Sequence, residues 1–378
     1  AGAGAARGGA GGAAGEAVER PLYVSPLSVA ERAALIMSVG EEVVQGSELT
    51  GLLEKKVHPV CYDGFEPSGR MHIAQGILKS IIVNKLVEAG CIFKFWVADW
   101  FAMLNHKMGG DLAKIRVVGE YMIEVWRASG MNVDAGNVQF LWASDEINKR
   151  PAEYWGRVMD VAMRNNLARI QRCCTIMGRK EADEMSASQI FYPCMQCADV
   201  FFLEADICQL GMDQRKVNML AREYCDATRP KIKHKPIIVS HHMLAGLKEG
   251  QEKMSKSDPD SAIFMEDTAA DVKRKIKRAF CPPGVVAGNP VLDWCRHIVF
   301  ARNGSMTVRR KPDNGGDVTF ASADEMEAAF AAGDLHPSDL KGALTEELNA
   351  MLQPVRDHFA SGRPKALLEK VKKYRVTR

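Results

Sequence analysis

Two short apolar runs on either side of a turn and a helix constrain the fold of this chain more than any other feature. Residues 60–62 and 92–98 are rich in β-branched and aromatic side chains, and the apolar residues of 73–89 recur at helical spacing. Residues 236–239 form a further run of this kind. Continuous apolar strands joined through helices are typical of a parallel sheet buried on both faces. We therefore predict an α/β fold whose main domain is a doubly wound, Rossmann-like parallel sheet.

The rest of the chain divides around this sheet. Residues 1–15 are alanine and glycine except for Arg7, so 1–20 are predicted to be a disordered tail, and 21–50 a helical extension. We predict a sheet domain at 51–278 with a helical insertion at about 140–190, and a mostly helical domain, with no strand, at 279–378. Helices are predicted at 28–44, 48–57, 115–129, 154–174, 198–209, 214–224, 268–280, 322–331 and 337–359.

Composition excludes several classes of protein. Of the 378 residues, 47% are hydrophobic and 26% are charged, which is typical of a soluble globular protein with a large core. No apolar run approaches the roughly 18–20 residues needed to cross a bilayer, so no membrane span is expected. Ten cysteines in so long a chain indicate reduced thiols in a cytoplasmic protein. Cys194 and Cys197 form a lone C-x-x-C, whereas structural zinc requires more ligands, so we predict no metal site.

The distribution of charge is more informative than its sum. A net charge of +3 does not by itself imply a polyanionic partner. Basic residues cluster, however, in the last third of the chain, at 273–275, 309–311 and 370–378. Such clusters suit a phosphate backbone, although solvated helix faces have the same composition.

A turn after the first predicted strand carries candidate phosphate-binding residues. Ligands bind an open parallel sheet at the carboxyl ends of its strands, so Tyr62 and Asp99, at two strand ends, are expected to face one crevice. Between Gly64 and Gly69 the side chains include small ones that let a nucleotide approach the backbone. His72 stands where a helix begins, and the free N–H groups there favour phosphate. Because a histidine at such a position is also typical of a helix cap, this signal is weak by itself.

The segment Lys253-Met254-Ser255-Lys256-Ser257 is a second phosphate-directed element. Two lysines interleaved with small hydroxyl residues form a cationic loop suited to a departing polyphosphate. A surface loop of ordinary composition does not account for this pentapeptide downstream of a histidine-bearing turn. The two segments are therefore interpreted together.

Together they resemble the signatures of class I aminoacyl-tRNA synthetases, a His-Ile-Gly-His turn and a Lys-Met-Ser-Lys-Ser loop. The second signature is intact, whereas the first reads His72-Ile73-Ala74-Gln75. Ala74 adds one methyl group where the family has glycine, and Gln75 keeps hydrogen-bonding capacity in place of histidine, so ATP binding is expected to survive. The resemblance implies that ATP, with Mg²⁺, activates an amino acid by converting it to its adenylate. The amino acid is then transferred from the adenylate to tRNA.

A third segment indicates the amino acid. The residues from Tyr192 to Asp199 resemble the tyrosine-binding helix of tyrosyl-tRNA synthetases of the archaeal and eukaryotic type, and the C-terminus resembles plant cytosolic members. Tyr192, Gln196 and Asp199 are spaced so that they share one helix face. A phenol needs a buried acceptor and a donor, which Asp199 and Tyr62 would supply, and phenylalanine would leave both unpaired. The resemblance implies that Tyr192 and Gln196 hold the α-amino group, with Gln214 nearby.

The resemblance covers roughly residue 50 to the end of the chain. It implies that 51–278 are catalytic, that the insertion forms a homodimer interface, and that 279–378 bind the anticodon of tRNA(Tyr) through His336 and Asp339. Asn314 stands where the family usually has a stacking aromatic residue. The expected site residues are Tyr62, Tyr192, Gln196, Asp199 and Gln214 for L-tyrosine, and Gly64, His72, Lys253, Met254, Ser255, Lys256 and Ser257 for ATP.

Three alternatives remain open. A tryptophanyl-tRNA synthetase shares both signatures, but an indole has no phenolic oxygen for the pair formed by Tyr62 and Asp199. A small-molecule nucleotidylyltransferase shares the histidine turn but explains neither this pocket nor the C-terminal domain. A non-catalytic, synthetase-derived RNA-binding protein would be expected to have lost the lysine loop or the pocket residues, and the chain retains both.

Overall fold

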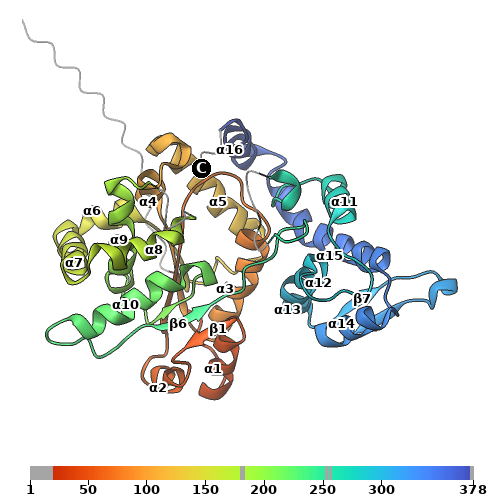
Figure 1. Cartoon of the computed structure of the whole chain (residues 1–378), viewed down its shortest axis with the longest axis horizontal. Helices are drawn as coiled ribbons and strands as arrows, with labels where there is room; N and C mark the ends of the chain where they lie inside the picture. Colours follow the sequence, from red (N-terminus) through yellow and green to blue (C-terminus); the bar gives the residue numbers. More distant parts are fainter. Residues whose placement is uncertain (1–19, 179–183, 252–253, 255–257, 375–378) are drawn as a thin grey trace, which may run out of the picture.

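A computed structural model describes residues 20–178, 184–251, 254 and 258–374. The predicted tail at 1–20 therefore lies outside the described residues except for Arg20. Six strands form the main sheet: β1 (Glu42–Val44), β2 (Val60–Phe65), β3 (Ile92–Val97), β4 (Val138–Trp142), β5 (Ile207–Cys208) and β6 (Ile237–Ser240). Their order is β1-β6-β5-β2-β3-β4 (Figure 1). All neighbours pair in parallel except β1, which is antiparallel to β6 at one edge.

The sheet separates two apolar cores, because successive side chains of a strand point to opposite faces. Cys61 and Phe95 belong to the first core, and Tyr62 and Trp96 to the second. The first core is covered by α1 (Val29–Met37), α2 (Glu48–Lys55), α3 (Lys79–Glu88) and α5 (Leu112–Ala128). The second core is covered by α6 (Ala143–Lys149), α7 (Pro151–Arg164), α8 (Leu167–Cys173), α9 (Ala187–Phe202) and α10 (Arg215–Ala227).

The C-terminal elements form a group beside the sheet, drawn from teal to blue in Figure 1. They are α11 (Ala269–Arg278), α12 (Pro290–Trp294), α13 (Ala301–Asn303), β7 (Met306–Val308), β8 (Val318–Phe320), α14 (Ala323–Ala332), α15 (Pro337–His358) and α16 (Gly362–Lys373). Helix α11 packs on α15, and α16 packs on α5. The first core continues from Val83 in α3 through Val272 in α11 to Leu348 in α15, so the group is joined to the sheet domain by packed side chains.

The prediction of a Rossmann-like parallel sheet with a helical insertion is confirmed, but some element boundaries were wrong. The helix predicted at 28–44 ends at Met37, and residues 42–44 form β1 because the β-branched Val43 and Val44 pair with β6. The helix predicted at 198–209 begins at Ala187 and ends at Phe202, since β5 follows in the centre of the sheet.

Other differences reflect local signals. The single helix predicted at 154–174 is two helices, because the Asn166 side chain accepts a hydrogen bond from Arg169 N and caps α8. No strand was predicted beyond 279, yet β7 and β8 form a hairpin whose Thr307 and Thr319 hydroxyls lie 2.9 Å apart. Strand β4 was also missed. Among the described residues, no helix has both the length and the apolar character that a bilayer span requires.

Candidate functional site

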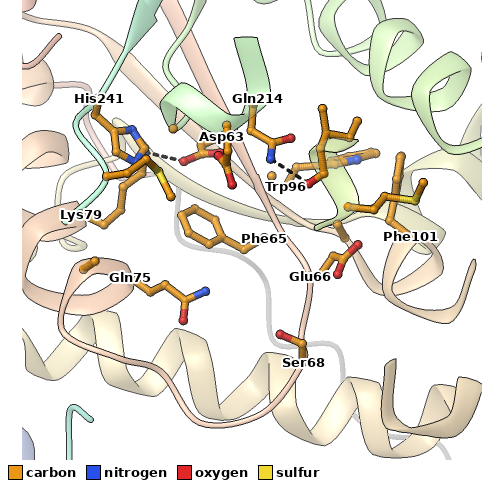
Figure 2. A pocket seen from close by; sticks show the side chains of 18 of the residues that line it. Asp63, Phe65, Glu66, Ser68, Gln75, Lys79, Trp96, Phe101, Gln214 and His241 are labelled. Carbon is orange, nitrogen blue, oxygen red and sulfur yellow. Dashed lines mark hydrogen bonds and ion pairs between the residues drawn. The ribbon is translucent and has the colours of Figure 1, made fainter. Parts of the chain in front are cut away.

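A cavity of about 410 Å³ opens at the carboxyl ends of β2 and β5, between which the order of the strands reverses (Figure 2). Its walls come from β2 and the turn after it, from the π-helix η1 (Ala74–Leu78), from α9, from the 3-10 turn η4 (Met212–Gln214), and from the segment after β6. The predicted residues that it brings together are Tyr62, Gly64, His72, Tyr192, Gln196, Asp199, Gln214 and Met254.

The α9 side of the cavity contains a buried phenol and a buried carboxyl group. Tyr62 is 1% exposed, and its hydroxyl has no hydrogen-bond partner among the described residues. Asp199 Oδ1 accepts a hydrogen bond of 2.8 Å from the Tyr154 hydroxyl. Burial raises the pKa of Asp199 well above its usual value, although the hydrogen bond from Tyr154 lowers it. A buried hydroxyl without a partner is costly, so this side is suited to a ligand that brings a polar group.

Two further hydrogen-bonded groups line the same side. The Tyr192 hydroxyl donates to Glu66 Oε1 at 2.7 Å, and Asn105 Nδ2 donates to the same oxygen at 3.0 Å. Gln196 Nε2 donates a hydrogen bond of 3.1 Å to Gln214 Oε1. Gln214 Nε2 in turn donates to the main-chain oxygen of Ile176, also at 3.1 Å. The carboxylate of Glu66 therefore faces the cavity in a fixed position next to Tyr192.

The opposite wall is formed by the His72 turn and the chain that follows the lysine loop. His72 forms a β-bridge with Phe264, and Ile73 N donates to Ile263 O at 2.8 Å. Gly76 allows this close approach, because a Cβ atom there would lie 2.1 Å from Met265 Sδ. Met254 is buried in this wall. The four other predicted loop residues, Lys253, Ser255, Lys256 and Ser257, lie outside the described residues.

Residues 54–353 match the family model of class I tRNA synthetases (W and Y). The chain belongs to this family. It is 61% identical over 351 residues to tyrosine–tRNA ligase 1, cytoplasmic, of Arabidopsis thaliana, covering 93% of this chain and 90% of that protein. It is 62% identical over 345 residues to tyrosine–tRNA ligase 2, cytoplasmic, of the same plant, covering 91% of this chain but 46% of that protein.

A solved structure gives the same result. The tyrosyl-tRNA synthetase of Leishmania major in complex with tyrosinol superposes with a TM-score of 0.85 at 54% identity. The match covers 92% of this chain and 61% of that one. The resemblance to tyrosyl-tRNA synthetases of the eukaryotic type, inferred from the sequence, is thereby confirmed.

Asp99 does not line the cavity, whereas Tyr62, which lies within β2, does. Helix α4 (Asp99–Leu104) begins at this residue and turns the carboxylate away from the cavity. Its oxygens accept hydrogen bonds from Ser144 N at 3.0 Å and Ser144 Oγ at 2.7 Å, and Arg116 Nε lies 2.9 Å away. Asp99 therefore joins β3 to α6, and the expectation that it faces the crevice was wrong.

His336 and Asp339 lie in the C-terminal group, apart from this cavity. His336 caps α15, and its ring Nδ1 accepts a hydrogen bond of 3.1 Å from Ser338 N. Lys273, Lys277 and Lys341 line a nearby groove of about 560 Å³ between α11 and α15. Cationic side chains thus surround the beginning of α15.

The sequence singled out two cysteines that belong to no site, and it gave no role to two residues that belong to the site or contact it. Cys194 and Cys197 are buried, free thiols and belong to no group of potential metal ligands in the described part of the chain. The sequence analysis missed Glu66, although it lies within the turn already singled out. It also missed Tyr154, for which the sequence carried no signal, because only the packing of α7 on α9 brings its hydroxyl to Asp199.

Proposed function

We propose that this chain is a tyrosine–tRNA ligase that activates L-tyrosine with ATP and transfers it to tRNA(Tyr). The observation that carries the proposal is the buried Tyr62 hydroxyl in the cavity of a class I synthetase, where it lies beside the Asp199 carboxyl group and has no hydrogen-bond partner in the described part of the chain. The family model covers enzymes for tryptophan and for tyrosine and does not choose between them. The names of the relatives favour tyrosine.

The phenol of the substrate would be recognised by hydrogen bonds at both of its atoms. Its O–H donates to Asp199, and its oxygen accepts from the Tyr62 hydroxyl. Burial raises the pKa of Tyr62 well above its usual value, so this hydroxyl keeps its proton at neutral pH. Phenylalanine would leave both protein groups unpaired, and burial of unpaired polar groups is strongly unfavourable.

The α-ammonium group would bind at the other end of the amino-acid site. Glu66 supplies a carboxylate there, held by Tyr192 and Asn105. Gln196 and Gln214 supply amide oxygens next to it. This assignment adds Glu66 to the residues expected from the family and gives Tyr192 the role of orienting that carboxylate.

ATP would bind between Gly64, His72 and the lysine loop. We propose that it enters as its Mg²⁺ complex, so that the metal is part of the substrate. The tyrosine carboxylate attacks the α-phosphorus, the bond to the bridging oxygen breaks, and pyrophosphate leaves with Mg²⁺. Lys253 and Lys256, with Ser255 and Ser257, would stabilise the negative charge of the leaving group, and His72 would donate to the phosphates. A terminal ribose hydroxyl of tRNA then attacks the acyl carbon, and AMP leaves.

The C-terminal group would bind the anticodon of the tRNA. His336 is exposed and Asp339 half-buried at the beginning of α15, and the lysines that line the adjacent groove suit the phosphate backbone. We therefore retain the assignment of 51–278 as the catalytic part and 279–378 as the anticodon-binding part. By the names of its plant relatives, we propose that the protein acts in the cytoplasm.

A homodimer is proposed from the apolar surface of the insertion. Met159 and Met163 in α7 and Leu167 in α8 are 56%, 81% and 58% exposed, and Phe191 in α9 is 49% exposed. Exposed apolar side chains concentrated on neighbouring helices are typical of a subunit interface. Light scattering coupled to size exclusion tests this: a dimer is expected, and Met163→Glu is expected to weaken it.

ATP–pyrophosphate exchange by the purified chain tests the proposed function. Exchange is expected with tyrosine and at background with tryptophan and phenylalanine, and charging of tRNA(Tyr) should follow. Equal exchange with tryptophan would support the other branch of the family. Retained tRNA binding without any exchange would identify a non-catalytic RNA-binding protein and refute the proposal.

A further inference from the structure

The segment that follows β6 lines the α3 side of the cavity. Residues 241–244 are all lining residues, and Figure 2 shows His241 together with Lys79, the first residue of α3. The His72 turn leads through η1 into the same helix, so this is the side assigned above to the nucleotide. The position of this segment therefore bears on how ATP is held.

The sheet holds only the beginning of the segment by main-chain hydrogen bonds. His241 N donates to Leu210 O at 2.9 Å, and Met212 N donates to His241 O at 3.1 Å. Beyond this point, no hydrogen bond joins the main chain of Met243 or Leu244 to another described residue. Since neither residue belongs to a strand or a helix, their placement depends on the residues on either side of them.

The C-terminal group holds both flanking residues through α12. Asp293 Oδ1 lies 2.7 Å from His242 Nε2, and Asp293 Oδ2 accepts a hydrogen bond of 3.1 Å from Ala245 N. The next residue, Trp294, is buried, and its indole Nε1 donates to Ala245 O at 2.9 Å. One carboxylate thus bridges the two ends of the unpaired stretch.

His242 is held from two further directions. Its Nδ1 lies 2.9 Å from Glu41 Oε2, and its ring stacks on the ring of His297 with the centroids 3.9 Å apart. His297 belongs to the π-helix η6 (Cys295–Phe300), which follows α12 and packs on η1, the helix after the His72 turn. Together, α12 and η6 therefore contact the α3 side of the cavity at two places.

We propose that Asp293 is a positioning residue for the nucleotide, through which the C-terminal group fixes residues 242–245 in the conformation that binds ATP. Asp293 does not itself line the cavity, so it acts on a ligand only through His242 and the main chain of Ala245. A carboxylate that anchors a short segment at both ends restricts its conformations before the ligand arrives, and this lowers the cost of binding. The inference rests on the proposed function, which places ATP in this cavity.

The variant Asp293→Ala removes both anchors at once. ATP–pyrophosphate exchange is measured at saturating tyrosine with ATP varied, and tyrosine affinity is measured separately by fluorescence titration. We expect KM for ATP to rise about tenfold, with kcat changed less than about twofold and an unchanged dissociation constant for tyrosine. Urea unfolding of the same preparation gives its stability, and a merely structural carboxylate would lower stability without changing KM for ATP.

The conservative variant Asp293→Asn should restore most of the function. Its side-chain oxygen can still accept from Ala245 N. Because His242 Nδ1 faces the Glu41 carboxylate, Nε2 of the neutral ring can accept from the new amide group. KM for ATP is therefore expected within about threefold of that of the unaltered chain.

Hydrogen exchange followed by mass spectrometry reports on the segment directly. In Asp293→Ala, the peptide that covers residues 241–247 should exchange about tenfold faster than in the unaltered chain, because Ala245 N loses its acceptor and the segment opens more often. Asp324→Ala is the matched control. It removes another carboxylate of the C-terminal group, which pairs with Arg296 and does not line the cavity, so neither the exchange of this peptide nor KM for ATP should change.

An unchanged KM for ATP in Asp293→Ala would overturn the inference, as would an equal loss of tyrosine affinity or the same rise in KM in Asp324→Ala. If Asp293→Ala does not fold, Trp294→Phe decides, since it keeps an aromatic ring and loses the hydrogen bond to Ala245 O. A KM for ATP raised about threefold is expected for this variant, and an unchanged value would overturn the inference. Absence of tyrosine-dependent exchange in the unaltered chain would instead refute the proposed function.

Discussion

The two sides of the cavity each bury a carboxyl group but surround it differently. On the α9 side, Asp199 accepts a hydrogen bond from the Tyr154 hydroxyl, and burial keeps its pKa well above the usual value. On the α3 side, Asp63 pairs with the Lys79 ammonium, which lowers its pKa, although burial still leaves it at about 6. The two groups are equally inaccessible and differ in the charge of their partners.

This difference corresponds to the substrates proposed for the two sides. A neutral phenol is recognised by donors and acceptors whose geometry selects a hydroxyl group. The nucleotide side is instead organised by ion pairs, which continue beyond Asp63: Arg70 pairs with Glu266 and Asp267, and Lys275 lies 2.6 Å from Asp267. These pairs hold the chain that follows the lysine loop against the His72 turn. Substitutions on one side should therefore leave the substrate of the other side bound.

The largest effect is expected when the cations of the nucleotide side are removed. Replacing both Lys253 and Lys256 with alanine should slow adenylate formation about a thousandfold, because charge on the leaving pyrophosphate loses its stabilisation. Tyrosine affinity should not change. Pre-steady-state kinetics measures both quantities. The control is Lys248→Ala, which replaces an exposed lysine of the same region and should change neither. A comparable loss of tyrosine affinity would contradict the separation of the two sides.

On the amino-acid side, Asp199→Asn should produce the converse pattern. The variant removes a buried acceptor for the phenol and leaves the Tyr154 hydroxyl with a weaker one, so kcat/KM for tyrosine should fall about a hundredfold. KM for ATP should remain that of the unaltered chain. Steady-state exchange with each substrate varied in turn measures this, and a parallel rise in KM for ATP would show that the sides are coupled.

A smaller and more specific effect is expected for Tyr62→Phe. Loss of one hydroxyl should weaken tyrosine binding about tenfold and reduce discrimination against phenylalanine. The free enzyme should be slightly more stable, because the hydroxyl removed has no partner among the described residues. Calorimetry with and without tyrosine measures both effects, and a less stable free enzyme would mean that the hydroxyl is satisfied in solution.

The smallest effect concerns the pH dependence of stability near the nucleotide side. His242 Nδ1 lies 2.9 Å from Glu41 Oε2, and its Nε2 lies 2.7 Å from Asp293 Oδ1. Burial opposes the charge of the imidazolium, but these carboxylates outweigh burial and raise its pKa above 6.5. The stabilisation is complete below pH 6.5 and is lost as the pH rises through the raised pKa.

Thermal unfolding from about pH 6 to 9 measures this dependence. The midpoint should fall by about 2 °C as His242 loses its proton, and His242→Gln should flatten the profile. Because Glu41 precedes β1 and Asp293 lies in α12, the change reports on the contact between the sheet domain and the C-terminal group. Burial lowers the pKa of His241 and His297, so these two groups contribute a stability that rises with pH up to about 6.5. The diagnostic quantity is therefore the midpoint relative to that of His242→Gln, and a difference that rises with pH would contradict the assignment.

Much of the site could be predicted because its residues are close together in the sequence. Tyr192, Gln196 and Asp199 share a face of one helix, so their spacing alone places them together, and all three line the cavity. Gly64 lies near the end of β2 and His72 follows it, and the end of such a strand had to lie at the ligand-binding edge. The same rule predicted that Asp99 faces the cavity, and this prediction was wrong. The rule places a residue at the edge of the sheet but does not orient its side chain.

The remaining interactions depend on long-range contacts. Strand β5 has two residues, too few for a periodic signal, and it exists only because β2 and β6 pair with it. The hairpin of β7 and β8 is similarly short. Tyr154 reaches Asp199 only after α7 packs on α9, which no local pattern predicts.

The sequence by itself determined the parallel sheet, the class of enzyme and the residues proposed for tyrosine. These depend on periodicity and on short motifs, both of which are local properties of the chain. Only the tertiary structure decided which buried carboxyl group meets a hydroxyl and which meets an ammonium. Sixteen residues separate Asp63 from Lys79, and forty-five separate Tyr154 from Asp199. The protonation of a buried group depends on its nearest neighbours in space, and those neighbours are fixed only when the strands and helices pack together.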